Sequence, residues 1–173
     1  MSRRVMVVWV LLLGFARQVD LLAIEPFATL EPPPVPFPYD NASFGASVSI
    51  AGDIIAVGAP ADQYPDAPNG RGAVFVFRWT GAVWTPEAKL IGSQAGLNDH
   101  FGFSIALQGD VLVGGEPHWD PAGSGAGQAT VFRRVGGTWT EEAVLSHSIS
   151  VPDDRFGWAV AVRARIHPSE NNN

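Results

Sequence analysis

The sequence of 173 residues contains no cysteine and little charge. Without cysteine, the chain cannot form a disulfide scaffold, a thiol nucleophile or a cysteine-based zinc site. Charged residues make up 16% of the chain, and the formal net charge is −6. An acidic chain without a basic run is a poor candidate for binding nucleic acid or an anionic membrane, so we expect no nucleic-acid partner.

Long hydrophobic runs are also absent. The longest, from Val5 to Phe15, is shorter than the about 20 residues that a spanning helix needs. An Arg-Arg pair precedes this run, and a small-x-small cleavage site ends at Ala16. Residues 1–16 are therefore predicted to be a signal peptide, and the protein is expected to be secreted or on the cell surface. An uncleaved anchor and a wrongly assigned start codon are the alternatives.

Glycine and proline are abundant, with 19 and 14 residues. Residues 17–43 form a proline-rich lead-in that is predicted to be an extended surface link, because proline fixes φ and removes a hydrogen-bond donor. We favour a spacer over a recognition motif here. Residues 26–30 resemble residues 86–90, so they are a candidate last strand of a preceding repeat unit.

A long internal repeat dominates the rest of the chain. FGASVSIAGDIIAVGAP (residues 44–60) returns as FGFSIALQGDVLVGGEP (residues 101–117), and FGWAVAV starts a third copy at residue 156. The copies are about 55 residues apart, a period that indicates stacked supersecondary units. The expected units are residues 44–100 and 101–155, followed by the start of a third unit and an irregular tail over 156–173.

Each full unit is predicted to contain four strands. The first, residues 46–50, alternates bulky Val48 and Ile50 with small serines, which suits a strand between two neighbouring sheets. Gly-Asp turns lead into apolar second strands at 54–59 and 111–115, and third strands follow at 73–78 and 129–134. The fourth strand alternates polar residues and contains Pro86, which predicts a solvated outer edge. The expected fold is all-β: a partial β-propeller of four-stranded antiparallel blades, two full blades plus the start of a third.

The anchor residues resemble the FG-GAP repeat, the blade unit of the propeller in integrin α subunits. The first copy matches the motif fully, the second has Glu116 in place of the central alanine, and the third has only its start. The matching residues are Phe44, Gly45, Gly58, Ala59, Pro60, Phe101, Gly102, Gly115, Pro117, Phe156 and Gly157. The resemblance implies a ligand-binding face made by the loops between strands two and three and the loops between units.

One departure concerns calcium. Integrin-type repeats often carry an aspartate-rich calcium loop between the first two strands, but residues 51–53 and 108–110 hold only a Gly-Asp turn. These turns offer too few oxygens for calcium, which takes 6 to 8 ligands. We therefore expect no cofactor, with calcium left open elsewhere.

Two loops offer candidate metal ligands. Asp62, Asp66 and Asn69 supply oxygens in one loop, although its prolines favour a plain turn. Glu116, His118 and Asp120 alternate in the matching loop and could hold a transition metal if that segment is extended, although a surface loop is the favoured interpretation.

Candidate ligand-binding residues lie in the same loops. Tyr64 and the group His118, Trp119 and Asp120 follow the GAP positions of the two units. Aromatic side chains in repeated loops suit contact with sugar or protein, and the alternative is that they fold over the top of the blade.

The sequence shows no catalytic motif. We therefore predict a non-catalytic extracellular binding or adhesion module that contacts protein or carbohydrate through its loops. A purely structural propeller fragment of a larger surface protein is the alternative, and a propeller hydrolase or lyase is less favoured. Two units cannot close a ring, so further blades or self-association are expected to cover the open edges.

Overall fold

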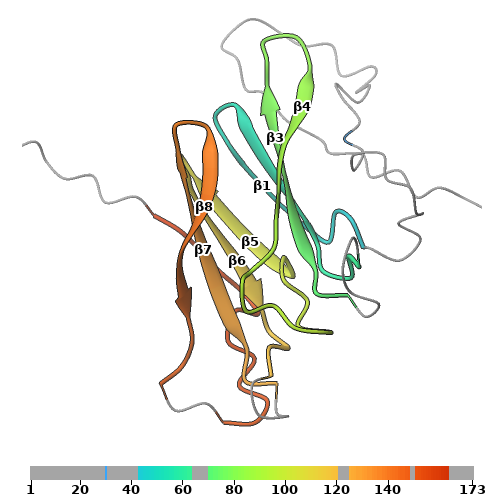
Figure 1. Cartoon of the computed structure of the whole chain (residues 1–173), viewed down its shortest axis with the longest axis vertical. Coiled ribbons are helices and arrows are strands. Elements are labelled where there is room, and N and C mark those ends of the chain that lie inside the picture. The colour runs from blue at the N-terminus through green and yellow to red at the C-terminus, as the bar shows by residue number, and fades with distance from the viewer. Residues whose placement is uncertain (1–29, 31–42, 64–69, 121–124, 149–150, 164–173) are drawn as a thin grey trace, which may run out of the picture.

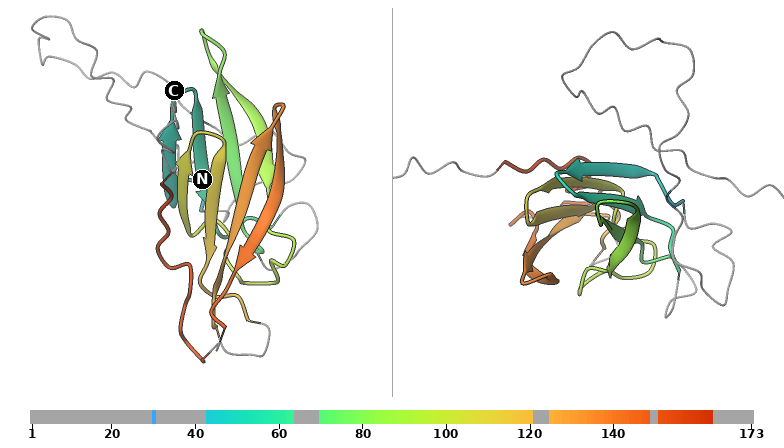
Figure 2. Two further views of the ribbon diagram at one scale, coloured as in Figure 1. Left: turned by 90° about the vertical axis from the view of Figure 1, so that its left-hand side faces the viewer. Right: turned by 90° about the horizontal axis from the view of Figure 1, so that it is seen from above.

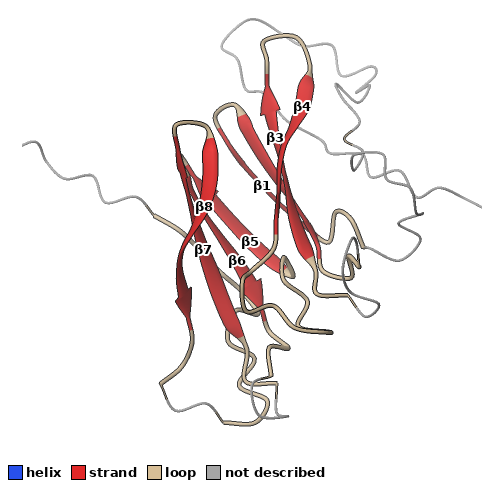
Figure 3. Ribbon diagram, viewed as in Figure 1, coloured by secondary structure: helices blue, strands red, loops and turns tan. Residues whose placement is uncertain are grey.

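The computed structural model describes residue 30 and residues 43–63, 70–120, 125–148 and 151–163. The predicted signal peptide and most of the proline-rich lead-in fall outside the described residues. Regular structure within the described part is all β (Figure 3), and none of it is a helix that could cross a membrane.

Eight strands form two four-stranded antiparallel sheets, one for each full repeat (Figure 1). The strand order follows the chain in both sheets, as the prediction of blade-like units requires. The first sheet contains β1 (Ser47–Ala51), β2 (Ile54–Ala59), β3 (Ala73–Trp79) and β4 (Trp84–Leu90). The second contains β5 (Ser104–Gln108), β6 (Val111–Glu116), β7 (Gln128–Val135) and β8 (Thr138–Leu145).

The two sheets stack face to face, as the two views in Figure 2 show. We call the face of a sheet that looks toward the following repeat its trailing face, and the opposite face its leading face. Because side chains alternate along a strand, the trailing face of the first sheet carries Ser47, Ser49 and Ala51 of β1 with the β2 and β3 residues that pair with them. The leading face of the second sheet carries Ile105 and Leu107 of β5.

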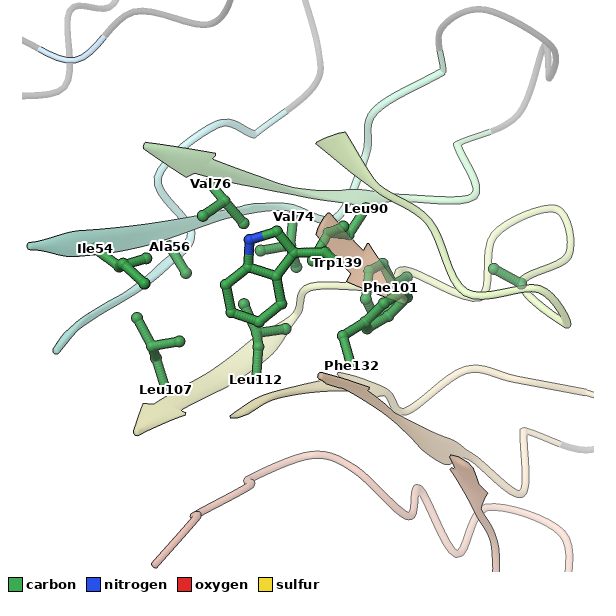
Figure 4. Packing of buried hydrophobic residues seen from close by; sticks show 11 residues of the cluster. Ile54, Ala56, Val74, Val76, Leu90, Phe101, Leu107, Leu112, Phe132 and Trp139 are labelled. Carbon is green, nitrogen blue, oxygen red and sulfur yellow. The ribbon is translucent and has the colours of Figure 1, made fainter. Parts of the chain in front are cut away.

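The main core lies between these two faces (Figure 4). Ile54, Ala56, Val74, Val76 and Leu90 come from the first sheet, and Leu107, Leu112, Phe132 and Trp139 come from the second. We call this packed layer between the two sheets the seam. The Trp139 side chain reaches into the seam from β8 and is 9% exposed. Trp139 therefore packs between the two sheets.

A polar contact closes the outer part of the seam. A β-bulge leaves Glu87 of β4 without a strand partner opposite β3. Its carboxylate accepts hydrogen bonds from Arg134 Nε at 2.6 Å and from Trp139 Nε1 at 2.8 Å, both on the second sheet. The predicted solvated edge is thus wrong for Glu87, whose side chain is 12% exposed, because the neighbouring sheet supplies its partners.

The Phe-Gly and Gly-Ala-Pro positions meet where one repeat joins the next. Ser47 Oγ donates to the Gly102 carbonyl oxygen at 2.8 Å, and a Cβ on Gly58 would collide with that same oxygen. The arrangement recurs in the next repeat, where Ser104 Oγ donates to Gly157 O at 2.7 Å and a Cβ on Gly115 would strike Gly157 O. The backbone of the following Phe-Gly turn therefore packs directly against the glycine at the start of GAP, where a side chain would not fit.

The third copy makes this starting contact but does not become a strand. Phe156 N donates to Ala126 O at 2.9 Å, as Phe101 N donates to Arg71 O at 2.9 Å. Val160 and Val162 are half-buried at the positions that correspond to Ile105 and Leu107. No described strand pairs with residues 158–163, and this is why the alternation there produces no strand.

The leading face of the first sheet has its own apolar cluster. Ile55, Phe75 and Phe77 are each 2% exposed, and Leu30 packs with them at 5%. In the seam between the sheets, Leu90 at the end of β4 packs with the corresponding residues Leu112 and Phe132 of the second sheet. Leu30 thus occupies the place that a fourth strand of a preceding unit would fill, in line with the likeness of residues 26–30 to 86–90.

Candidate functional site

The loops predicted to share one face do contact one another. Asn98 N donates to Gly70 O at 3.1 Å, which joins the loop between units to the β2–β3 loop. In the second unit, Arg155 N donates to Gly125 O at 3.3 Å and likewise joins the loop after β8 to the β6–β7 loop. These loops lie at the lower end of the sheets in Figure 1, opposite the short hairpin turns. We call this the loop end.

Acidic residues before each Phe-Gly turn fix the loops. Asp99 Oδ2 accepts a hydrogen bond from Gly96 N at 2.5 Å, and Asp154 Oδ2 accepts one from Val151 N at 3.0 Å. Asp99 is 5% exposed, and its burial is the main cause that raises the pKa of this carboxyl. Side-chain to backbone bonds of this kind stabilise turns because they satisfy an amide that strand pairing leaves free.

Aromatic rings gather at the loop end of the second repeat. The ring centroids of Phe103 and Trp158 are 4.7 Å apart, and His118 lies 6.2 Å from Phe103 and 6.4 Å from Trp158. The Arg155 guanidinium lies 5.4 Å from the centroid of the Trp158 ring. Trp158 is 50% exposed, so this aromatic cluster presents an indole to solvent beside a cation.

A histidine pair adjoins this cluster. His100 Nδ1 and His118 Nδ1 are 2.9 Å apart, so one ring donates a proton and the other accepts it. Burial lowers the pKa of His100, and the neighbouring His118 lowers it further. The pair joins the loop between units to the β6–β7 loop.

The structure describes three of the four predicted ligand-binding residues, and these three differ in their surroundings. His118 belongs to the aromatic cluster, Asp120 is exposed, and Trp119 is half-buried. Trp119 N donates to Glu116 O at 3.1 Å, and Gly127 N donates to Trp119 O at 3.0 Å, so the base of this loop is held by its backbone. Tyr64 lies outside the described residues.

The predicted oxygen ligands of the first loop are only partly described. Asp62 is 2% exposed and forms an ion pair with Lys89 Nζ at 2.5 Å. Asp66 and Asn69 lie outside the described residues, so a metal site of these three residues stays a prediction. Within the described ranges, no group of three or more histidine or acidic side chains is arranged to hold a metal.

Glu116 differs from its prediction as a residue of a surface loop. It is the last residue of β6 and 0% exposed. Its carboxylate accepts hydrogen bonds from Thr130 Oγ1 at 2.6 Å and from Gln128 Nε2 at 3.0 Å. Burial raises the pKa of this carboxyl. The extended segment that a metal site of Glu116, His118 and Asp120 would need is not formed, because the strand continues through Glu116 and the chain then turns.

The sequence held a signal for this buried network. Glu116, Gln128 and Thr130 occupy the positions that Ala59, Ala73 and Phe75 fill in the first repeat. The three polar residues replace one large and two small apolar ones on the leading face. Gly92 lies against them, and a Cβ there would come within 2.8 Å of Glu116 Oε1. A concerted change of three residues that meet across two strands indicates a buried polar cluster.

Two repeated four-stranded sheets, stacked and joined through their Phe-Gly turns, define a propeller-type repeat module with its blades not closed into a ring among the described residues. A family model of the FG-GAP repeat matches residues 39–77 and 84–132, which together make up about half of the chain. The chain therefore belongs to the FG-GAP repeat family. No curated protein matches this sequence.

Proposed function

We propose that this chain is a non-catalytic binding module that works outside the cell and contacts a protein or carbohydrate ligand through its loop end. FG-GAP repeats are typical of extracellular and surface proteins, and the predicted signal peptide at residues 1–16 supports the same location.

The aromatic cluster of Phe103, His118 and Trp158 is the observation that carries this proposal. Tryptophan gives a large contact area at a small entropic cost, and half of the Trp158 surface is exposed beside the Arg155 cation. The ring is anchored on one side by Phe103 at 4.7 Å, so it is held for stacking against a flat apolar surface. Sugar rings and aromatic or aliphatic protein side chains both offer such a surface.

Binding of the purified chain to a glycan array, and in parallel to a panel of extracellular proteins, tests the proposal. We expect a ligand whose affinity falls roughly tenfold or more in Trp158→Ala, because a central aromatic contact typically dominates an interface. Trp119→Ala tests the neighbouring loop. Val135→Ala is the matched control, because Val135 is 65% exposed at the β7–β8 hairpin, away from the loop end.

Two outcomes would contradict the proposal. One is a ligand that binds the Trp158→Ala variant as tightly as the wild type. The other is the absence of any ligand from both panels while the chain is folded, which would favour the purely structural alternative.

A further inference from the structure

The contact between the two sheets pairs bulky side chains, which we call knobs, with a surface of small residues, which we call the socket. The knobs are Ile105 and Leu107 on the leading face of β5, and both pack into the core seam. The socket is the small-residue side of β1, where Ser49 Oγ accepts a hydrogen bond from Leu107 N at 3.0 Å and Ser47 Oγ donates to Gly102 O. Small residues allow the two strands to approach closely, and bulky ones fill the remaining space.

The first repeat presents the same knobs without a described socket. Val48 and Ile50 of β1 correspond to Ile105 and Leu107 and lie on the leading face of the first sheet. Val48 is 46% exposed and Ile50 is 49% exposed, whereas Leu107 is 8% exposed. Two large β-branched residues stand side by side on an edge strand, an arrangement that soluble proteins usually cover.

The third copy presents the small side of a first strand. Residues 156–163 rest on the second sheet through Gly157, with Val160 and Val162 turned inward and half-buried. Ala159 and Ala161 are exposed at the positions that correspond to Ser104 and Ala106. The two ends of the described repeat array are therefore complementary in the way that β5 and β1 are.

We propose that two copies of this chain associate head to tail, with Val48 and Ile50 of one copy packed against Ala159 and Ala161 of the next. The contact is heterologous, so a dimer keeps the knob of one copy and the socket of the other free, and the association continues to a closed ring or an open filament. The internal seam supplies the geometry for the contact. Alanine at position 159 lacks the hydroxyl of Ser47, so this joint is weaker than the seam within the chain.

Sedimentation velocity across a concentration series of the full chain tests the proposal. We expect a mass that rises with concentration beyond a single copy. Ile50→Asp removes the knob and Ala161→Arg fills the socket, so each variant should associate roughly tenfold or more weakly. Val135→Asp is the control, because this valine is also exposed, at 65% against 49% for Ile50, and lies outside the proposed contact. Near-ultraviolet circular dichroism checks that each variant is folded.

Mixing the two variants distinguishes head-to-tail association from other modes. The Ile50→Asp chain keeps a working socket and the Ala161→Arg chain keeps a working knob, so an equal mixture should form one-to-one dimers that stop growing. Three results would overturn the proposal: a wild type that stays monomeric at high concentration, assembly that Ile50→Asp leaves unchanged, or a mixture of folded variants that forms no dimer.

Discussion

Gly58→Ala isolates the contact that the GAP glycine makes with the next repeat. The Gly58 backbone lies inside β2, and it is not among the glycines with positive φ, so alanine suits its backbone conformation. The obstacle is space. A Cβ would lie 3.2 Å from the Gly102 carbonyl carbon and closer than 3.0 Å to both Gly102 O and Ser47 Oγ.

The cost has two parts. Moving the Ser47 hydroxyl breaks its hydrogen bond to Gly102 O, which costs about 1 kcal/mol. The carbonyl of Gly102 cannot rotate away freely, because Gly102 lies in the Phe-Gly turn with φ of 83° and Gly102 N donates to Gly115 O. Displacing this packed backbone costs about 1–3 kcal/mol. We therefore expect Gly58→Ala to lower the free energy of unfolding by about 2–4 kcal/mol.

Gly52→Ala is the matched control. Gly52 has φ of 59° in the β1–β2 turn, and a Cβ there meets nothing within 4 Å. Its cost is backbone strain alone, about 1 kcal/mol. Urea unfolding followed by tryptophan fluorescence compares the two variants. If Gly58→Ala destabilises the chain no more than Gly52→Ala does, the close contact between Gly58 and the next Phe-Gly turn does not require a glycine, and the reasoning is refuted. A Ser47→Ala/Gly58→Ala double variant should cost less than the two single changes combined.

Two further predictions concern the seam and the buried carboxyl. Leu90→Ala should cost about 2–5 kcal/mol, because Leu90 is 6% exposed in the seam, whereas Leu145→Ala at the corresponding, 45% exposed position should cost below about 1 kcal/mol; equal costs in urea unfolding would contradict the assigned faces. For Glu116, the raised pKa means that the folded protein holds this proton more tightly than the unfolded chain. Its contribution to stability is therefore largest at low pH and declines as the pH rises above the ordinary value of 4.5. Glu116→Gln should remove this decline, so melting temperatures of variant and wild type should diverge with rising pH, and parallel curves would argue against a buried, proton-holding carboxyl.

Much of the fold could be predicted because the same pattern of strand and turn residues occurs in two copies. Two copies in register indicate where the strands lie, and no observed bound differs from its predicted one by more than one residue. The β-bulges at Glu87 and, in the second repeat, at Glu142 could not be predicted, because a bulge depends on how neighbouring strands twist past each other. The first of these bulges is also why Glu87 reaches Arg134 and Trp139.

The repeat also misleads where one residue changes the space available to another. Phe101 is fully buried with its ring over Gly114, where a Cβ would strike the ring. The first repeat has Val57 at that position, and Phe44 is half-buried against Phe75 and Phe77 instead. Two phenylalanines that match in sequence thus occupy different places.

The candidate site was less predictable than the fold. The loop position of His118 predicts a role in binding, but no signal in the sequence marks Phe103 and Trp158, the partners that make it part of a cluster. They meet because the third copy docks beside the β6–β7 loop. Contacts between units depend on that stacking, which a single sequence does not specify residue by residue.

The network of Glu116, Gln128 and Thr130 also bears on which strands pair with one another while the repeats fold. Neighbouring repeats of similar sequence risk exchanging strands while they fold. A chain that placed β6 where β2 belongs would bury the Glu116 carboxyl group against Ala73 and Phe75, whose side chains offer no hydrogen-bond donor, and a buried polar group without a partner is unfavourable. The same carboxylate is satisfied only beside its own β7. The polar cluster therefore favours pairing of β6 with the β7 strand of its own blade over pairing with a strand of the neighbouring blade.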